Sequence, residues 1–111
     1  MKNTYDLPAV IQHRNLLFDF YGSLLTERQA DCFSMRYVDD LSLAEIGQEL
    51  DISPQAVVDF LNRGIKSLER YEKHLELVAK FQQRQAIINK ILSESKDMET
   101  IKKYANELLQ I

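Results

Sequence analysis

The polar side chains that could bind or react gather on one predicted helix, which begins at Pro54. Its exposed face, with the residue before it, would carry six of them: Ser53, Gln55, Asp59, Asn62, Arg63 and Lys66. Gln can pair with adenine through two hydrogen bonds, and Arg can reach guanine or phosphate. However, Asp59 places a negative charge where phosphates would lie, and Val58 and Phe60 add apolar surface. The segment therefore predicts a binding surface for nucleic acid or a protein partner, with little capacity to read DNA bases.

Residues typical of catalysis or of metal binding do not accompany that surface. Asp39 and Asp40 are adjacent carboxylates without a partner acid, base or metal ligand, so they indicate the end of a helix. Cys32 is the only cysteine, which excludes an intrachain disulfide and fits a reducing compartment. His13 and His74 lack ligand spacing. We expect a non-enzymatic protein with no catalytic residue, no metal, no cofactor and no small-molecule substrate.

Composition and charge narrow the class of protein further. The chain has 111 residues, of which 45% are hydrophobic and 28% charged, as in ordinary globular proteins. The net charge is −3, and residues 27–52 carry two arginines against seven carboxylates. A dense basic patch, the usual mark of a non-specific nucleic-acid binder, is not visible in the sequence. Because no apolar run approaches the roughly 20 residues that span a bilayer, and no signal-peptide core is present, we expect a cytoplasmic protein without membrane insertion.

The elements that must position the binding face are predicted to be helices, because only three Gly and two Pro interrupt the chain. A first helix is expected from Pro8, which suits a first helical position. Thr26 and Gln29 have the spacing of a capping box and begin a second helix, which Asp39 and Asp40 end.

The central motif consists of two helix starts within twelve residues. Ser42 opens a second capping box, and Ser53 is an N-cap followed by Pro54. Asp51 lies in the turn between them, where Gly is common, and is expected to adopt a left-handed conformation. Gly47 is small enough to let the two helices cross closely. This arrangement is typical of a helix-turn-helix.

The C-terminal part leaves one structural question open. The helix from Pro54 either continues past His74 as one long element or breaks near His74 or Leu75. SESKD, residues 93–97, predicts a turn, and residues 98–111 predict a last amphipathic helix.

An apolar stripe along this region predicts a dimer interface: Leu68, Tyr71, Leu75, Val78, Phe81 and Ile88. A small chain has limited core in which to bury so many apolar residues. Either the last helix folds back over the stripe or a second subunit covers it, and a homodimer through residues 68–111 is our preferred hypothesis. We thus expect an all-α fold of five to six helices in one compact unit, with a helix-turn-helix domain at 1–73 and a dimerising helical extension at 74–111.

Leu25 to Tyr71 resembles region 4 of bacterial sigma factors, with a capped LTERQ helix, then RYVDDLSLAEIGQELDIS, then a recognition helix with a K-x-L-E-type tail. The longer pattern from LFDFYGSLLTERQ to IKSLERYEKHL resembles the YlxM-like family of small bacterial proteins. This resemblance implies a helix-turn-helix of the winged-helix-like DNA-binding superfamily. It also implies a regulatory or accessory role in the signal recognition particle pathway, with the particle's GTPase or RNA as the expected partner.

Two functions therefore compete. The first is an accessory protein that binds a protein or ribonucleoprotein through the helix-turn-helix face or the C-terminal helices. The alternative is a dimeric regulator of transcription that binds double-stranded DNA, whose two recognition helices would need to lie about 34 Å apart. An RNA binder is a third class, although the sequence contains no recognised RNA-binding module.

Overall fold

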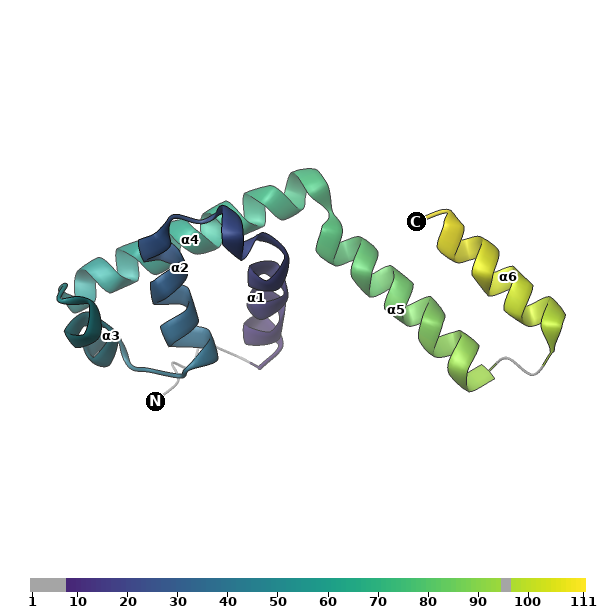
Figure 1. The fold of residues 1–111 in the computed structure, drawn as a ribbon, viewed down its shortest axis with the longest axis horizontal. Helices are drawn as coiled ribbons and strands as arrows, with labels where there is room; N and C mark the ends of the chain where they lie inside the picture. Colours follow the sequence, from purple (N-terminus) through teal and green to yellow (C-terminus); the bar gives the residue numbers. More distant parts are fainter. Residues whose placement is uncertain (1–7, 95–96) are drawn as a thin grey trace. The chain divides into compact units, whose positions relative to one another are not determined.

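The computed structural model describes residues 8–94 and 97–111, which form six α-helices, two short helical segments and no strand (Figure 1). In chain order these are α1 (Pro8–Tyr21), η1 (Gly22–Leu24), α2 (Glu27–Phe33), η2 (Ser34–Val38), α3 (Leu43–Leu50), α4 (Pro54–Leu75), α5 (Leu77–Glu94) and α6 (Met98–Leu109). The predicted all-α fold is therefore confirmed.

The chain divides into two compact units at the junction of Leu75 and Glu76. Glu76 has a left-handed backbone with φ of 55°, which a right-handed helix cannot accommodate, so α4 ends before it. The sequence left open whether the helix from Pro54 continues past His74 or breaks near it, and the structure shows the break. The division lies close to the predicted boundary between residues 73 and 74, and it separates two units where the sequence suggested one.

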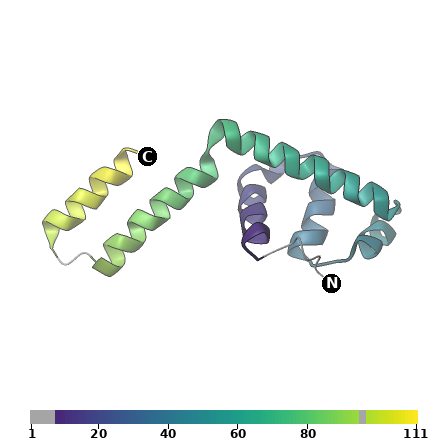
Figure 2. The ribbon, with the colours of Figure 1, turned by 180° about the vertical axis from the view of Figure 1, so that it is seen from behind.

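In the first unit, α1, α2 and α3 all pack against the long helix α4 (Figures 1 and 2). The side chains buried between them are apolar or aromatic: Leu17, Tyr21, Cys32, Phe33, Ile46, Val57, Leu61 and Leu68. Phe33 lies at the centre of this core, with its ring centroid 4.7 Å from that of Phe18 and 4.7 Å from that of Tyr37. Helix α4 is thus held on its inner side and keeps its outer side exposed.

Both predicted capping boxes are present. The Thr26 hydroxyl accepts a hydrogen bond from the backbone N–H of Gln29 at 3.2 Å, and the Thr26 N–H donates to the Gln29 side chain at 3.2 Å. Ser42 and Glu45 make the same reciprocal pair at 3.1 and 3.0 Å. These bonds satisfy amide groups that a helix leaves without partners, so they fix where α2 and α3 begin.

The turn between α3 and α4 also follows the prediction, with one correction. Asp51 is left-handed, with φ of 55° and ψ of 48°, and the Ser53 hydroxyl caps α4 by accepting from the N–H of Ala56 at 3.1 Å. The role expected of Gly47 is narrower than a crossing of two helices, because a Cβ there would lie 2.7 Å from the Ile52 carbonyl oxygen in the turn and 3.5 Å from the nitrogen of Pro54, where α4 begins. Gly47 makes room for the backbone of the turn, where the sequence suggested that it made room for a crossing helix.

The second predicted helix is in fact two segments. After Phe33 the backbone widens into the π-helical segment η2, in which the N–H of Asp39 donates to the carbonyl of Ser34 at 3.0 Å. A π-helical turn contains an extra residue, so it changes the direction in which the following side chains point. Asp40 then adopts a left-handed conformation with φ of 58° and reverses the chain.

The second unit is an antiparallel hairpin of α5 and α6 (Figures 1 and 2). The side chains that are half-buried on these helices include Ile87, Ile91, Tyr104 and Leu108. Of the turn predicted at residues 93–97, Ser93 and Glu94 belong to α5, residues 95–96 lie outside the described residues, and Asp97 is the N-cap of α6. The Asp97 carboxylate accepts from the N–H of Thr100 at 2.8 Å.

Candidate functional site

The structure places all six residues of the predicted binding face on α4 or at its N-cap, and all six are exposed: Ser53, Gln55, Asp59, Asn62, Arg63 and Lys66. The opposite side of the helix carries the buried residues Val57, Leu61 and Gly64. This division follows from the helical period, which sends residues three and four apart to the same side. The outer face of α4 is therefore accessible to a ligand in the single chain.

An ion pair on this face weakens its ability to read bases. The Arg63 guanidinium lies 3.2 Å from the Asp59 carboxylate, one helical turn away. Both side chains are well exposed, at 68% and 56%, so the pair contributes at most about 1 kcal/mol and a competing anion can displace it. As it stands, the pair offsets the charge of Arg63, the first cation along α4 after Gln55.

A row of four exposed cations continues along the same face towards the end of α4. These residues, which we call the basic stripe, are Arg63, Lys66, Arg70 and Lys73. Their spacing of three, four and three residues keeps them on one side of the helix. Arg70 also lies over the Tyr71 ring, 5.6 Å from its centroid, which helps to hold the guanidinium in place.

The fold increases the net charge of this face, because it removes one carboxylate from it. Glu72 is half-buried and accepts a hydrogen bond from the Tyr21 hydroxyl at 2.6 Å, on the inner side of α4. From Asp59 to Lys73, the exposed side chains are then four cations against Asp59 and Glu69, a net charge of +2. The sequence count alone missed this stripe, although its spacing could have revealed it.

Of the six residues predicted for dimerisation, two are buried in the single chain, two are half-buried and two are exposed, and the two buried residues need correction. Leu68 and Val78 are buried in the single chain, at 0% and 1% exposed, so a second subunit is not needed to cover them. Tyr71 is half-buried, with its ring centroid 5.9 Å from that of Tyr21 in the same unit. Phe81 is half-buried as well, whereas two residues remain exposed: Leu75 and Ile88.

Large apolar side chains are instead exposed on the hairpin. We call the following residues the hairpin face: Ile88 and Leu92 of α5, and Met98, Ile101 and Leu109 of α6. Leu92 and Leu109 are the most exposed of them, at 79% and 80%. All five lie within residues 68–111, through which the homodimer was predicted, but only Ile88 was among the six residues named for the interface.

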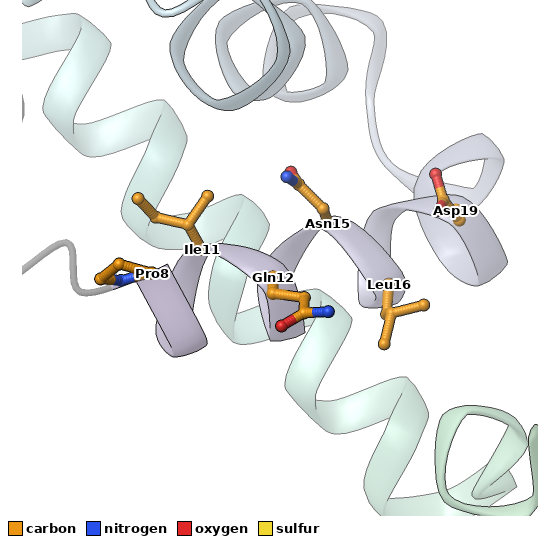
Figure 3. Close-up of a pocket in the computed structure, with 6 residues that line it drawn as sticks. All are labelled: Pro8, Ile11, Gln12, Asn15, Leu16 and Asp19. Carbon is orange, nitrogen blue, oxygen red and sulfur yellow. The ribbon is translucent and has the colours of Figure 1, made fainter. Parts of the chain in front are cut away.

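A pocket of about 420 Å³ lies along α1 (Figure 3). The described residues that line it all belong to that helix: Pro8, Ile11, Gln12, Asn15, Leu16 and Asp19. Figure 3 shows Asn15 pointing away from Gln12 and Leu16, and its Oδ1 atom is buried without a hydrogen-bond partner among the described residues. Since the described lining comes from a single helix, we assign no binding role to this pocket.

The residues considered for catalysis lie apart from these surfaces. Asp39 and Asp40 are exposed at the end of η2, and Cys32 is buried, where the loss of solvent raises the pKa of its thiol. Among the described residues, no group of three or more His, Cys, Asp or Glu side chains could hold a metal ion. The helices of the described part are also too short or too polar to cross a membrane.

Comparison with known proteins identifies the family of this chain. Residues 11–108 match the UPF0122 family of YlxM / p13-like helix-turn-helix proteins. The chain belongs to this family. It is 52% identical over 77 residues to UPF0122 proteins of Bacillus cereus (strain AH187), Bacillus anthracis (strain A0248) and Bacillus thuringiensis subsp. konkukian (strain 97-27). Each alignment covers 69% of this chain and 70% of the relative. UPF0122 is thus a helix-turn-helix family, a class of regulatory or DNA-binding proteins, and is not a known enzyme family.

Proposed function

We propose that this UPF0122 protein is a non-enzymatic accessory protein that binds a ribonucleoprotein through the outer face of α4. The observation that supports this is the basic stripe, which runs over ten residue steps from Arg63 to Lys73 and hence about 15 Å of helix. Along the axis of a DNA duplex, that length corresponds to roughly four phosphates of one strand at about 3.4 Å each. The stripe therefore suits a nucleic-acid backbone, and the signal recognition particle, with its RNA and GTPase, is the candidate implied by the family resemblance.

The same face favours phosphate binding over base reading. The cation in the N-terminal half of α4, Arg63, is paired with Asp59. Gln55 and Asn62 are the neutral groups that could contact bases. Phosphate contacts position a protein on nucleic acid but carry no sequence information. Binding should accordingly depend strongly on salt and weakly on sequence.

The test is a salt titration of binding to the particle's RNA and to duplex DNA, from about 50 to about 200 mM salt. Replacing Lys66 and Lys73 by Gln should lower the slope of log affinity against log salt by about 1.4 on single strands or about 1.8 on duplex. Replacing Lys102 and Lys103 of α6 removes the same charge from exposed positions elsewhere and should leave the slope unchanged. Equal losses in the two variants would overturn the assignment to α4.

A second candidate function is a dimeric DNA-binding regulator, and the exposed Gln55 favours it. An exposed Gln near the start of a recognition helix can bind adenine bidentately, which is worth about 1–3 kcal/mol of discrimination. If this is the function, selection from random duplexes should yield one sequence, and Gln55→Ala should relax the preference at a single base pair. Binding that stays equal across duplex sequences would exclude it.

We also propose that the protein is a homodimer formed through the hairpin face. When two helices pack antiparallel, each has a row of residues that contacts the other helix. The residues that follow these contact residues by one position point to the same side of the pair on both helices. Ile88 and Leu92 follow Ile87 and Ile91 by one residue, and Leu109 follows Leu108 in the same way, so both helices contribute to one apolar side. Two such hairpins would form a four-helix bundle.

The size and charge of the second unit support a second copy of this chain as the partner that covers the hairpin face. The second unit contains about 36 residues, and units below about 40 residues usually need oligomerisation or another covalent or metal constraint to fold. Residues 76–111 carry six cations and five carboxylates, so two copies can approach without strong repulsion. Helices of 18 and 12 residues present a footprint on the order of 500 Å² per copy, which reaches the roughly 1,000 Å² of a specific interface.

Light scattering at micromolar concentration should give the mass of two chains, and Leu92→Glu with Leu109→Glu should give one. The control Leu24→Glu places the same charge on an exposed leucine of the first unit, at 55% exposed, and should remain a dimer. A single-chain mass for the unmodified protein would exclude the dimer.

A further inference from the structure

A single residue separates α4 from α5. Leu75 ends the first helix, Leu77 begins the second, and Glu76 between them has a φ of 55°. This left-handed conformation disfavours a residue other than glycine about 5- to 30-fold relative to the right-handed helix. The Glu76 carbonyl already accepts a hydrogen bond from the N–H of Lys80 at 3.0 Å, as it would inside a helix. The interruption therefore consists of one residue in an unfavourable conformation.

The sequence on both sides of Glu76 favours a continuous helix. Residues 65–94 contain neither Gly nor Pro, and Glu itself is a good helix former. In a continuous helix, the buried Val78 would lie on the same side as Tyr71 and Leu75, seven and three residues earlier. The apolar side of α4 would thus extend past Glu76 without placing a charge on it.

A continuous helix would also lengthen the basic stripe. The alternating spacing of three and four residues that begins at Arg63 continues beyond Lys73 through Leu77 to Lys80 and Arg84. Side chains at this spacing drift by about 20° in every seven residues, so the drift over the whole stripe is about 60°. Six cations would then lie on one side of about 32 Å of helix.

We propose that Glu76 is a hinge that returns to the right-handed helix when a nucleic-acid strand binds. The joined helix would run from Pro54 to Glu94 and bind the strand through the basic stripe together with Lys80 and Arg84. This inference rests on the function proposed above, because the strand supplies the phosphates that the two added cations contact.

The two added cations lie in a segment that suits phosphate. Residues 77–93 contain no carboxylate. Arg84 is exposed, and its Nη2 atom lies 3.4 Å from the carbonyl oxygen of Ile111, a long contact that a charged phosphate can replace. Lys80 is half-buried, one helical turn before Arg84.

Two added contacts are enough to move the equilibrium of the hinge. On a single strand they steepen the salt dependence by about 1.4, which strengthens binding about 25-fold at about 0.1 M salt relative to about 1 M. A ligand that binds one state about 25-fold more tightly raises that state from about 4% of the molecules to about half. Binding and joining of the helices would therefore be coupled.

The first experiment measures a distance across the hinge in the full-length protein. Spin labels are attached to cysteines at the exposed positions Glu69 and Asn89, with Cys32 replaced by Ala. In a joined helix these positions are about 30 Å apart, and any break at Glu76 shortens the distance. We expect less than 30 Å in the free protein and about 30 Å with saturating single-stranded RNA. A distance that bound RNA leaves unchanged would overturn the hinge.

The second experiment separates backbone conformation from charge. Glu76→Gly and Glu76→Gln remove the same carboxylate, but only Gly adopts the left-handed conformation without steric cost. Glu76→Gly should therefore keep the break and lower the slope of log affinity against log salt by about 1.4, whereas Glu76→Gln should keep the full slope. Replacing Lys80 and Arg84 by Gln should lower the slope by the same amount, with no further loss when Gly is present at position 76. Equal slopes for Glu76→Gly and Glu76→Gln would refute the coupling.

The outcomes also separate the hinge from the proposed function. RNA binding that depends on Lys66 and Lys73, with an unchanged label distance, would refute the hinge and keep the function. If no RNA binds at any salt, the function fails and the free protein still tests the hinge through Glu76→Ile. A β-branched residue is a rare outlier in the left-handed region, so this variant should show the 30 Å distance. The same short distance as in Glu76→Gly would then refute the hinge as well.

Discussion

Gly47 offers the sharpest test of how the helix-turn-helix is built. A Cβ at this position would lie 2.7 Å from the Ile52 carbonyl oxygen and 3.5 Å from the backbone nitrogen of Pro54. Both neighbours are backbone atoms of the turn, so they cannot move aside as a flexible side chain would. Gly47→Ala should therefore push the turn away from α3 and disturb the start of α4.

The size of the effect follows from three contributions. Overpacking against fixed atoms costs about 1–3 kcal/mol. The bond from the Ile52 N–H to the Gly47 carbonyl, now 2.9 Å, is weakened at a cost of about 0.5–1.5 kcal/mol. The higher helix propensity of Ala offsets about 1 kcal/mol of this. We expect a net loss of about 2 kcal/mol, and a fall of about 8–16 °C in the Tm of a unit of this size.

Gly64→Ala is the matched control, because it makes the same chemical change in a helix with room for a methyl group. Its Cβ would lie 3.6 Å from the Gln29 Cβ and 3.8 Å from Leu25 Cδ1, which are ordinary contacts. This variant should gain about 1 kcal/mol, which raises the Tm by about 4–8 °C. Urea and thermal unfolding of both variants, followed by circular dichroism, give the comparison. Equal stability of the two variants would refute the role assigned to Gly47.

Three further predictions concern single residues. Asp51→Gly should raise the urea midpoint, with a gain of about 0.5–1 kcal/mol, because Asp is left-handed here and Gly adopts that conformation without steric cost. Hydrogen bonds from Ser42 lower the pKa of Glu45 below its ordinary value of 4.5. The stability that this carboxylate adds is thus present above pH 4.5 and lost as the pH falls through its folded pKa. An NMR titration of the Glu45 carboxyl should show a midpoint below the ordinary value, and Glu45→Gln should remove this pH dependence of stability. Burial raises the pKa of the Cys32 thiol, so the folded protein loses stability as the pH rises past the ordinary thiol pKa. Because Cys32 is buried, a thiol reagent should label it slowly. The labelling should be about 30-fold faster in Gly47→Ala if that variant loses about 2 kcal/mol of stability.

Local structure was predictable where a few neighbouring residues determine it. The starts of α2, α3 and α4 follow from Thr26, Ser42 and Ser53, because a capping side chain bonds to an amide only three residues away. The left-handed Asp51 was predictable for the same reason. In contrast, η2 was not, because Thr26, Gln29 and the apolar residues after them fit a regular helix equally well.

The candidate site was predictable only in part. The exposed residues of α4 follow from the helical period, but the dimer stripe included Leu68 and Val78, which the folded chain already buries. Sequence periodicity identifies an apolar side of a helix without saying which neighbour covers it. The partner of that side depends on contacts between residues far apart in the chain.

Taken alone, the sequence determined the capped helix starts and the helix-turn-helix, because those depend on interactions over three or four residues. The tertiary structure decided what each side of α4 contacts. It paired Glu72, on the inner side, with the Tyr21 hydroxyl, 51 positions away. It also brought Arg14 and Arg36 into one groove with Asn62. A count of charges along the chain cannot show this, since electrostatic interaction depends on distance in space.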